Sequence, residues 1–514
     1  MSYLDRLVQK AKDEKPAPVK QIEKGKQEPE PEPAEGRVLI DSYGDVKIYH
    51  DSAEPLPLYF VPTPHYKGGE KQLIDALMEI ALGVVPLDPH LPLIERRKRY
   101  FDGIMGIIDA TPELRVPVNA KQFYAKAVVQ EMIGYGPIDP LTEDDNLEEI
   151  MVIGPGKPVY VYHRKYEMMR TNIVIYEDKD IRNLTDRIAR VIGRRIDVQV
   201  PLLDARLPDG TRVNATILPI SLNGATLTLR KFKTDPLTVI DLINHGTIDM
   251  DLAALFWLAT DGIGAYPANI LVSGGTASGK TTTLNVLSSF IPNQERVISI
   301  EDTAELSLPL NHWVRFETRP PSMEGTGEIT MNDLVKNSLR MRPDRILVGE
   351  IRGAEGYTMF AAMNTGHRGV MGTVHANSAQ ETLVRLASPP ISVPNIMIGS
   401  LNLVLMQNRI HDRRKGMIRR ITEIAEVVSA EGEPPKIQVL YGWDPIKDEM
   451  FPTKMNSIYL DTLRRFTGLT RDDLQSELDE RKRVLSVLHS KGVRDLKGVC
   501  EVTQNYILRK KLKL

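Results

Sequence analysis

Residues 274–281 read GGTASGKT and follow a short apolar run at residues 270–272. The spacing is G-x-x-x-x-G-K-[ST], in which glycines let backbone N–H groups approach phosphate oxygens at the start of a helix. Lys280 can reach the β- and γ-phosphates, and the Thr281 hydroxyl can bind Mg²⁺. The alternative is a glycine turn that binds no nucleotide. The predicted nucleotide-binding residues are Gly274, Gly275, Thr276, Ala277, Ser278, Gly279, Lys280, Thr281 and Thr282.

Two apolar, strand-like segments after this loop end in carboxylates. Residues 345–350 end in Glu350, and residues 297–300 lead into Glu301 and Asp302, with Glu305 shortly after. Ligand-binding residues of an open α/β sheet gather at the carboxyl ends of its strands. We therefore expect Glu350 to hold Mg²⁺ through water and one of the other carboxylates to orient or deprotonate an attacking water. Helix capping or turn formation is the alternative for Glu301 and Asp302.

Two histidines, His367 and His375, bracket one short strand-like segment at residues 370–374. His375 follows that segment, on the side where the phosphates are expected, and could sense a γ-phosphate. A structural role is the alternative for both histidines. No acidic or cysteine ligand at a suitable spacing supports a metal site here.

The composition is that of a soluble protein with several domains. The chain has 514 residues, 42% of them hydrophobic, and this length gives a prior of about three domains. Lys and Arg number 66 and Asp and Glu 68, so the formal charge is −2 and a general nucleic-acid coat is not favoured. The single cysteine, Cys500, excludes an internal disulfide framework and a multi-cysteine metal site. No transmembrane run or signal peptide is recognised, so we expect a cytoplasmic location.

The pattern of apolar residues predicts how these groups are positioned. Short apolar strands alternate with helices over residues 269–450, which is typical of a parallel sheet. Pro236 lies in the expected hinge, residues 233–237. The predicted parts are 1–36, a disordered or short amphipathic segment with a Pro/Glu-rich linker; 37–235, an N-terminal α/β domain; 236–248, a linker; 249–450, the domain with the phosphate-binding loop; and 451–514, a C-terminal helical segment.

Four sequence boxes occur in a fixed order: SGGTASGKTTTLN, ISIEDTAEL, LRMRPDRILVGEIRGAEG and NTGHRGVMGTVHAN. With GYGPIDPLTEDDNLEEIMV and LLDARLPDGTRVNAT further upstream, they resemble the ATPases of the type II/IV secretion superfamily over roughly residues 125–450. The segments IEDTAELSLP and NHWV look most like archaeal members. Among these, the motor ATPase of the archaellum is the first choice, and an archaeal type IV pilus or secretion ATPase is the second.

The resemblance implies an α/β fold class, with a P-loop RecA-like parallel-sheet C-terminal domain preceded by a smaller mixed α/β N-terminal domain. It implies that ATP is hydrolysed with Mg²⁺ at Lys280 and Thr281, that Glu301 or Glu305 activates water, and that Glu350 supports the metal. It also places His367 and His375 near the nucleotide. The implied arginine fingers, with surface ion pairs as the alternative, are Arg212 and Arg230, then Arg206, or Arg340 and Arg342 within the C-terminal domain.

The resemblance also implies partners. They are further copies of the chain in a homohexamer, a polytopic membrane platform protein and a second, ATPase-like regulator in the cytoplasm. The chain would then lie in the cytoplasm at the inner face of the membrane. No stable metal cluster and no nucleic acid are expected. A nucleic-acid translocase and a scaffold that binds ATP without turnover remain as alternatives, although the charge of −2 and 6% aromatic residues disfavour a basic stacking channel.

Overall fold

The computed structural model describes residues 37–52, 54–62, 68–85, 93–114, 116–231, 236–321, 326–430 and 433–511. The chain divides into two compact units, Met1–Lys233 and Thr234–Leu514. The predicted N-terminal segment at 1–36 and residues 233–235 of the predicted hinge lie outside the described residues.

The first unit contains a nine-stranded sheet in the order β1-β2-β3-β6-β5-β4-β9-β8-β7. Neighbouring strands run antiparallel except β3 and β6. Alternate residues point inward, so Ile150, Val161 and Leu229 join the apolar stripe of α6 (Asp178–Val191) in one core. The strands are β1 (Arg37–Tyr43), β2 (Val46–Asp51), β3 (Leu58–Phe60), β4 (Leu147–Val152), β5 (Pro158–His163), β6 (Glu167–Val174), β7 (Leu202–Arg206), β8 (Arg212–Thr216) and β9 (Thr226–Arg230).

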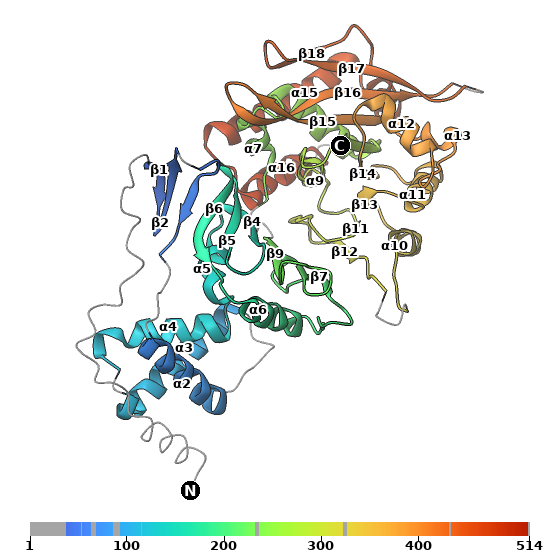
Figure 1. Cartoon of the computed structure of the whole chain (residues 1–514). Helices are drawn as coiled ribbons and strands as arrows, with labels where there is room; N and C mark the ends of the chain where they lie inside the picture. The colour runs from blue at the N-terminus through green and yellow to red at the C-terminus, as the bar shows by residue number, and fades with distance from the viewer. Residues whose placement is uncertain are drawn as a thin grey trace. The chain divides into compact units, whose positions relative to one another are not determined.

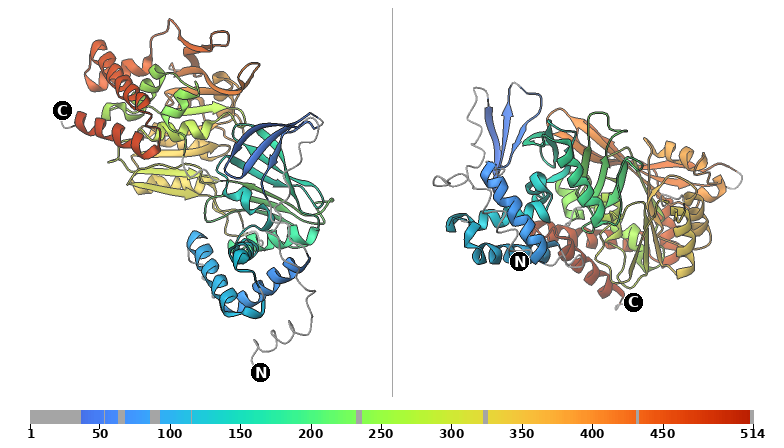
Figure 2. Two further views of the ribbon diagram at one scale, coloured as in Figure 1. Left: turned by 90° about the vertical axis from the view of Figure 1, so that its left-hand side faces the viewer. Right: turned by 60° about the horizontal axis from the view of Figure 1, so that its bottom comes forward.

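Three helices of the same unit form a bundle with its own core. They are α2 (Gly68–Val84), α3 (Leu93–Ala110) and α4 (Lys121–Met132), and α5 (Asp139–Glu143) leads from them to β4. Leu77, Ile104 and Val128 meet inside the bundle. Figures 1 and 2 show these helices as one group in shades of blue.

The second unit contains another nine-stranded sheet, in the order β12-β11-β13-β14-β10-β15-β16-β17-β18. The strands are β10 (Ile270–Gly274), β11 (Val297–Glu301), β12 (Trp313–Glu317), β13 (Arg345–Ile351), β14 (Met371–Val374), β15 (Leu403–Asp412), β16 (Gly416–Val428), β17 (Lys436–Asp444) and β18 (Glu449–Pro452). The strands from β10 to β15 are parallel.

The expectation of a parallel sheet throughout residues 269–450 is wrong for the last part of that range. β15 to β18 form an antiparallel meander. Only Arg413, Arg414 and Lys415 separate β15 from β16. A parallel connection needs a crossover of about a dozen residues or more, whereas a short turn closes an antiparallel pair. Gly416, with φ of +72°, begins the returning strand.

Helices cover both faces of this second sheet. Ile270 and Val272 of β10 point to the face of α7 (Val239–Asn244), α8 (Met250–Asp261), α9 (Lys280–Ser288), α14 (Ile458–Thr467), α15 (Arg471–Ser490) and α16 (Leu496–Lys511). Leu271 points to the other face, where α10 (Met331–Ser338), α11 (Glu355–Asn364), α12 (Ala379–Ala387) and α13 (Asn395–Ile398) pack. This is the arrangement expected of an α/β fold, and the predicted fold class is confirmed.

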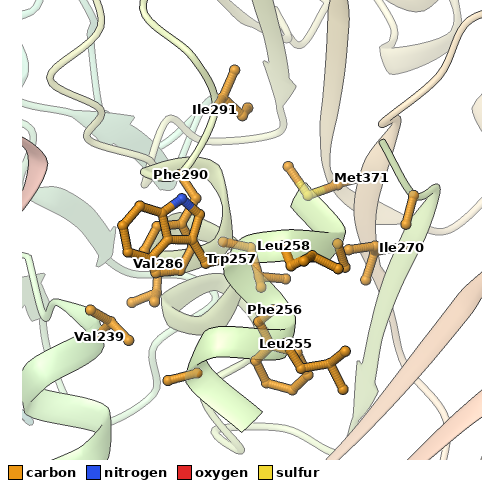
Figure 3. Packing of buried hydrophobic residues seen from close by; sticks show 14 of the residues in the cluster. Val239, Leu255, Phe256, Trp257, Leu258, Ile270, Val286, Phe290, Ile291 and Met371 are labelled. Carbon is orange, nitrogen blue, oxygen red and sulfur yellow. The ribbon is translucent and has the colours of Figure 1, made fainter. Parts of the chain in front are cut away.

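The core on the face of Ile270 and Val272 joins the C-terminal helices to α9, the helix that follows the phosphate-binding loop. Trp257 of α8 stacks on Phe290 at a ring-centroid distance of 5.4 Å and meets Tyr506 of α16 edge-on at 5.1 Å. Figure 3 shows Trp257 beside Phe290 and Val286. Residues 236–248 contain α7, and its Val239 is buried in this core. Among the described helices, none has the length and apolar character to cross a membrane.

Candidate nucleotide-binding site

The phosphate-binding loop joins β10 to α9 with the geometry that its sequence requires. Gly279 precedes α9 with φ of +97°, a conformation that glycine adopts without strain. A Cβ atom at Gly274 would lie 2.2 Å from the backbone oxygen of Gln407, so only glycine fits there. The Lys280 ammonium turns back over the loop and donates to the Gly275 carbonyl over 3.0 Å. The N-terminus of α9 and this ammonium therefore face the same loop interior.

Lys280 also interacts electrostatically with Glu350, the carboxylate at the end of β13. Burial lowers the pKa of Lys280, and the charge of Glu350 opposes that shift. The two predicted groups thus lie within electrostatic reach of each other.

Strand order ranks the remaining predicted groups by their distance from the loop. Across the sheet from β10, the next strands in order are β14, β13 and β11. Their carboxyl ends carry His375, Glu350 and Glu301. Neighbouring strands lie about 4.8 Å apart, so these positions are one, two and three strands away, or roughly 5, 10 and 14 Å. All three lie on the edge of the sheet that bears the phosphate-binding loop.

Arg352, which was not predicted as a site residue, joins Glu350 to the acidic end of β11. Arg352 forms one ion pair with Glu350 and another with Asp302 at 3.2 Å. The Glu350 side chain is 23% exposed and Arg352 is 67% exposed, so the pair lies at the surface of this edge. No motif or spacing marked Arg352 as a partner of Asp302, since the contact depends on β11 pairing with β13.

Glu301 is buried at the end of β11, whereas Glu305 is exposed. The Oε1 atom of Glu301 accepts hydrogen bonds from the backbone N–H groups of Glu305 and Leu306 at 2.9 and 3.0 Å. Its Oε2 atom is buried with no hydrogen-bond partner among the described residues. Burial raises the pKa of Glu301 to about 7, although the two N–H groups act to lower it. A carboxyl that titrates near neutral pH is suited to proton transfer.

The two predicted histidines lie on opposite edges of the sheet. His375 directly follows the carboxyl end of β14 and is partly buried. His367 precedes the same strand, and its backbone N–H donates to the Ala362 carbonyl at the end of α11. Of the two, the structure brings only His375 to the edge of the phosphate-binding loop.

The predicted arginines of the first unit form one row across its sheet. Strand pairing sets Arg206 opposite Arg212, Arg212 opposite Arg230, and Arg230 opposite Glu149. Residues directly opposite each other point to the same face of a sheet, so the three guanidinium groups share a face. Arg230 lies 3.6 Å from Glu149, and Arg206 donates to the Gly210 carbonyl.

Arg340 and Arg342 lie far from the phosphate-binding edge of their own unit. Both precede β13, whose seven residues run toward Glu350. Glu350 is the sixth of these residues, so at about 3.3 Å per residue the strand separates both arginines from Glu350 by roughly 16 Å or more. The structure therefore does not bring these two arginines to the loop of the same chain.

Further residues that hold the loop and its helix were not predicted. Thr283 of α9 donates to the side chain of Gln407 at 2.6 Å, and Ser307 N–H donates to Asn285 at 2.8 Å. Arg419 donates through Nε to the Ala277 carbonyl at 3.0 Å. The pairing of β10 with β15, more than a hundred residues later, brings Gln407 here, and the pairing of β15 with β16 brings Arg419. Local sequence offered no signal for the pairing of β10 with β15.

The donor set fits a nucleoside triphosphate with Mg²⁺. The N-terminus of α9 and Lys280 supply positive potential for phosphate oxygens, and the Ser278 hydroxyl is buried with no partner among the described residues. Thr281 and Glu350 carry oxygen atoms of the kind that Mg²⁺ prefers as ligands. Within the described ranges, no group of three or more His, Cys, Asp or Glu side chains is arranged to hold a metal ion by itself.

Comparison with known proteins places these features in context. Residues 131–430 match the family described as Type II/IV secretion system protein. An uncharacterised protein of Methanocaldococcus jannaschii is 33% identical over 545 aligned residues, which cover 72% of this chain and 75% of the relative. The type IV secretion system protein PtlH of Bordetella pertussis is 32% identical, covering 50% of this chain and 81% of PtlH. The solved VirB11 ATPase of the Brucella suis type IV secretion system is 26% identical, covering 56% of this chain and 91% of its own, with a TM-score of 0.28.

Proposed function

The chain belongs to the type II/IV secretion system protein family and is an ATPase, and we propose that it is the hexameric motor of an archaeal type IV pilus-like filament, the archaellum. One observation carries the proposal. A complete phosphate-binding loop shares a sheet edge with His375, Glu350 and Glu301. The resemblance of IEDTAELSLP and NHWV to archaeal members and the Methanocaldococcus relative support the choice of an archaeal system.

In this proposal each residue at the edge has a defined task. Lys280 and the N–H groups at the start of α9 bind the phosphates, and Glu301, once ionised, accepts a proton from the attacking water. Thr281 and Glu350 would hold Mg²⁺, which neutralises charge on the phosphates. His375, one strand from the loop, would contact the γ-phosphate.

Hydrolysis would be coupled to motion between the two units. ATP would draw the first unit onto the loop, and phosphate release would let it open, with residues 233–237 as the hinge. The row of Arg206, Arg212 and Arg230 supports a role for that sheet face at a phosphate, because arginine stays charged and pairs with phosphate oxygens in two places. Arg212 and Arg230 would serve the site of a neighbouring copy.

Repeated closure around the ring would act on a polytopic membrane platform protein, with the chain at the inner face of the membrane. A second ATPase-like protein would regulate the ring. The similarity to PtlH favours a second candidate, an archaeal type IV pilus or type II-like secretion ATPase. Both candidates share the same chemistry and differ in the filament or substrate that they move.

The first test measures ATP hydrolysis by the purified full chain over a range of protein concentrations, with and without lipid vesicles and DNA. A motor that assembles into a ring should show specific activity that rises with protein concentration and with vesicles. DNA should leave it unchanged, and Glu350→Gln should abolish it. Flat specific activity would contradict the ring, strong stimulation by DNA would favour a translocase, and binding without turnover would favour a scaffold.

A second test separates the two filament systems. The gene is deleted in the organism that carries it, and swimming, surface pili and secreted proteins are then compared with the parent strain. Cells that stop swimming while retaining their pili and secreted proteins support the archaellum. Loss of pili or of secretion with normal swimming would support the second candidate instead.

A further inference from the structure

Gln407 of β15 contacts the phosphate-binding loop at both of its ends. It lies opposite Gly274 in the parallel pairing, and its backbone oxygen leaves no room for a side chain there. Its side-chain oxygen accepts the Thr283 hydroxyl at 2.6 Å, and its side-chain nitrogen is 2.9 Å from where a Cβ of Gly279 would stand. Gln407 is 1% exposed, so these contacts are not shared with solvent.

Arg419 holds the outermost part of the same loop. It comes from β16, the partner of β15, and its Nε–H donates to the Ala277 carbonyl at 3.0 Å. Its Cδ atom lies 3.5 Å from the Cβ position of Gly279. Ala277 has φ of +57°, which costs a residue with a Cβ about 1 kcal/mol, and the bond from Arg419 helps to offset that cost.

The bond to Ala277 also sets the direction of the next backbone N–H. A trans peptide unit is planar, and its C=O and N–H point in opposite directions. With the Ala277 oxygen held on the Arg419 side, the Ser278 N–H points into the loop, where it makes a long contact of 3.4 Å with the Gly275 oxygen. The Lys280 ammonium approaches the same oxygen. The two donors thus converge on the interior that phosphate oxygens would enter.

We propose that Arg419 is a positioning residue for nucleotide binding. From the β15–β16 hairpin, it fixes the Ala277–Ser278 peptide so that the loop's donors are aimed at the phosphates before nucleotide arrives. Gln407 anchors the two ends of the loop to the same hairpin. Nucleotide binding and the position of the hairpin are therefore coupled, and the coupling acts in both directions. The inference rests on nucleotide binding by this loop and not on which filament the protein drives.

The test compares Arg419→Ala, Arg419→Lys and a control, Arg414→Ala, in the full-length chain. Arg414 belongs to the same hairpin and is exposed, and within the described part of the chain only its backbone N–H makes a hydrogen bond, to Asp412. Fluorescent ADP is titrated into each protein, KM and kcat for ATP are measured, and thermal unfolding is followed without nucleotide. We expect Arg419→Ala to weaken ADP binding and raise KM about tenfold, with kcat and the melting temperature nearly unchanged. Arg419→Lys should bind ADP at least about threefold more tightly than Arg419→Ala, because the lysine ammonium can still donate to the Ala277 carbonyl.

Two results would overturn the proposal. One is ADP binding by Arg419→Ala equal to that of Arg414→Ala. The other is a fall in melting temperature that accompanies the loss of binding and is not relieved by lysine, which marks a merely structural contact. If the alanine variant does not fold, hydrogen exchange on the wild-type chain gives the answer. ADP should slow exchange in the hairpin around residues 417–421 as well as in the loop, and unchanged exchange in the hairpin contradicts the coupling.

Failure of this inference is distinguishable from failure of the proposed function. Wild-type ADP binding is measured first and tests the loop itself. A wild-type chain that binds ADP, with an Arg419→Ala variant that binds it equally well, removes the role of Arg419 and leaves the ATPase in place.

Discussion

The backbone N–H of Leu306 donates a hydrogen bond of 3.0 Å to the carboxylate of Glu301, at the point where β11 gives way to a loop. The carboxylate that we propose as the proton acceptor therefore also holds the chain that follows it. Glutamine keeps a side-chain oxygen that can accept the same bond but cannot take up a proton at neutral pH. This substitution separates the two tasks.

The first prediction concerns the pH dependence of hydrolysis. Burial raises the pKa of Glu301 to about 7, so the carboxyl is mostly neutral at pH 6 and mostly ionised at pH 8. If its ionised form accepts the proton, the rate at saturating ATP should rise about tenfold across that range. Glu301→Gln should show a low rate without this rise, and it should remain folded, because glutamine can still accept the bond from the Leu306 N–H. The measurement is a pH–rate profile of both proteins.

Glu305→Gln is the matched control, because it changes an exposed carboxylate in the same loop. We expect it to retain the pH profile of the wild type. A Glu305→Gln variant that loses the rise while Glu301→Gln keeps it would reverse the assignment of the two residues.

The same shift predicts how stability depends on pH. The ordinary pKa of this carboxyl is 4.5, and in the folded chain it is about 7. The folded state therefore holds a proton that the unfolded state releases across this window, and the contribution of Glu301 to the free energy of unfolding falls as pH rises from 4.5 to 7. In Glu301→Gln that contribution should be absent, which thermal unfolding at a series of pH values can measure. Identical pH dependence in the two proteins would contradict it.

The third prediction concerns Glu350, the carboxylate two strands from the loop. Glu350→Gln should retain ADP binding within about threefold, since Lys280 and the start of α9 are untouched, while hydrolysis falls by about a hundredfold or more. Fluorescence titration and steady-state kinetics measure the two effects. Asp302→Asn is the control, since Asp302 shares the partner Arg352 but lies one strand further out. An equal loss of hydrolysis in Glu350→Gln and Asp302→Asn would show that hydrolysis depends on the ion pairs with Arg352 and not on the Glu350 carboxylate itself.

The sequence was sufficient for features that depend on local order. The loop at 274–281 and the strand that carries Glu350 near its carboxyl end lie where their spacing predicted. Within α3, Tyr100, Ile104 and Ile108 form a helical stripe, but the basic residues before it obscured the pattern, and that helix was not predicted. Such a signal is present in the sequence and could have been found.

Other features could not be derived, because they depend on which distant strands become neighbours. His367 and His375 are eight positions apart in one box, yet the strand between them carries them to opposite edges of the sheet. Arg419 reaches the phosphate-binding loop only because β15 pairs with β10 and β16 folds back on β15. The pairing of β10 with β15 has no local sequence signature, whereas the three-residue turn before Gly416 is a local signal for the return of β16. The residues that bind nucleotide were therefore easier to predict than those that position them.

The fourth prediction concerns the C-terminal helices. Arg481 of α15 forms an ion pair of 2.8 Å with Asp261 of α8, and both side chains are 3% exposed. Arg481→Met would leave a buried carboxylate without its cation, which costs about 3–5 kcal/mol. For a unit of this size we expect the melting temperature to fall by about 10 °C. Adding Asp261→Leu should recover most of the loss, because the unpaired charge is gone.

Lys482→Ala is the control for this ion pair, since it removes the exposed pair between Lys482 and Asp251 on the same two helices. Exposed pairs contribute about 0–1 kcal/mol, so the melting temperature should change little. If Arg481→Met behaves like Lys482→Ala, the buried pair does not hold α15 in place.

The last prediction tests whether Arg212 acts across a boundary between copies. Arg212→Ala keeps an intact nucleotide site with Glu350 but lacks the arginine. Glu350→Gln lacks the carboxylate of its own site but keeps Arg212. Each variant alone should be nearly inactive. When equal amounts are mixed and allowed to exchange subunits, about a quarter of the interfaces pair an intact site with an intact arginine, and activity should rise toward about a quarter of the wild-type value. An arginine that served its own chain would leave the mixture at the mean of the two inactive proteins. The double variant Arg212→Ala, Glu350→Gln mixed with either single variant is the control, since it contributes no intact partner and should restore nothing.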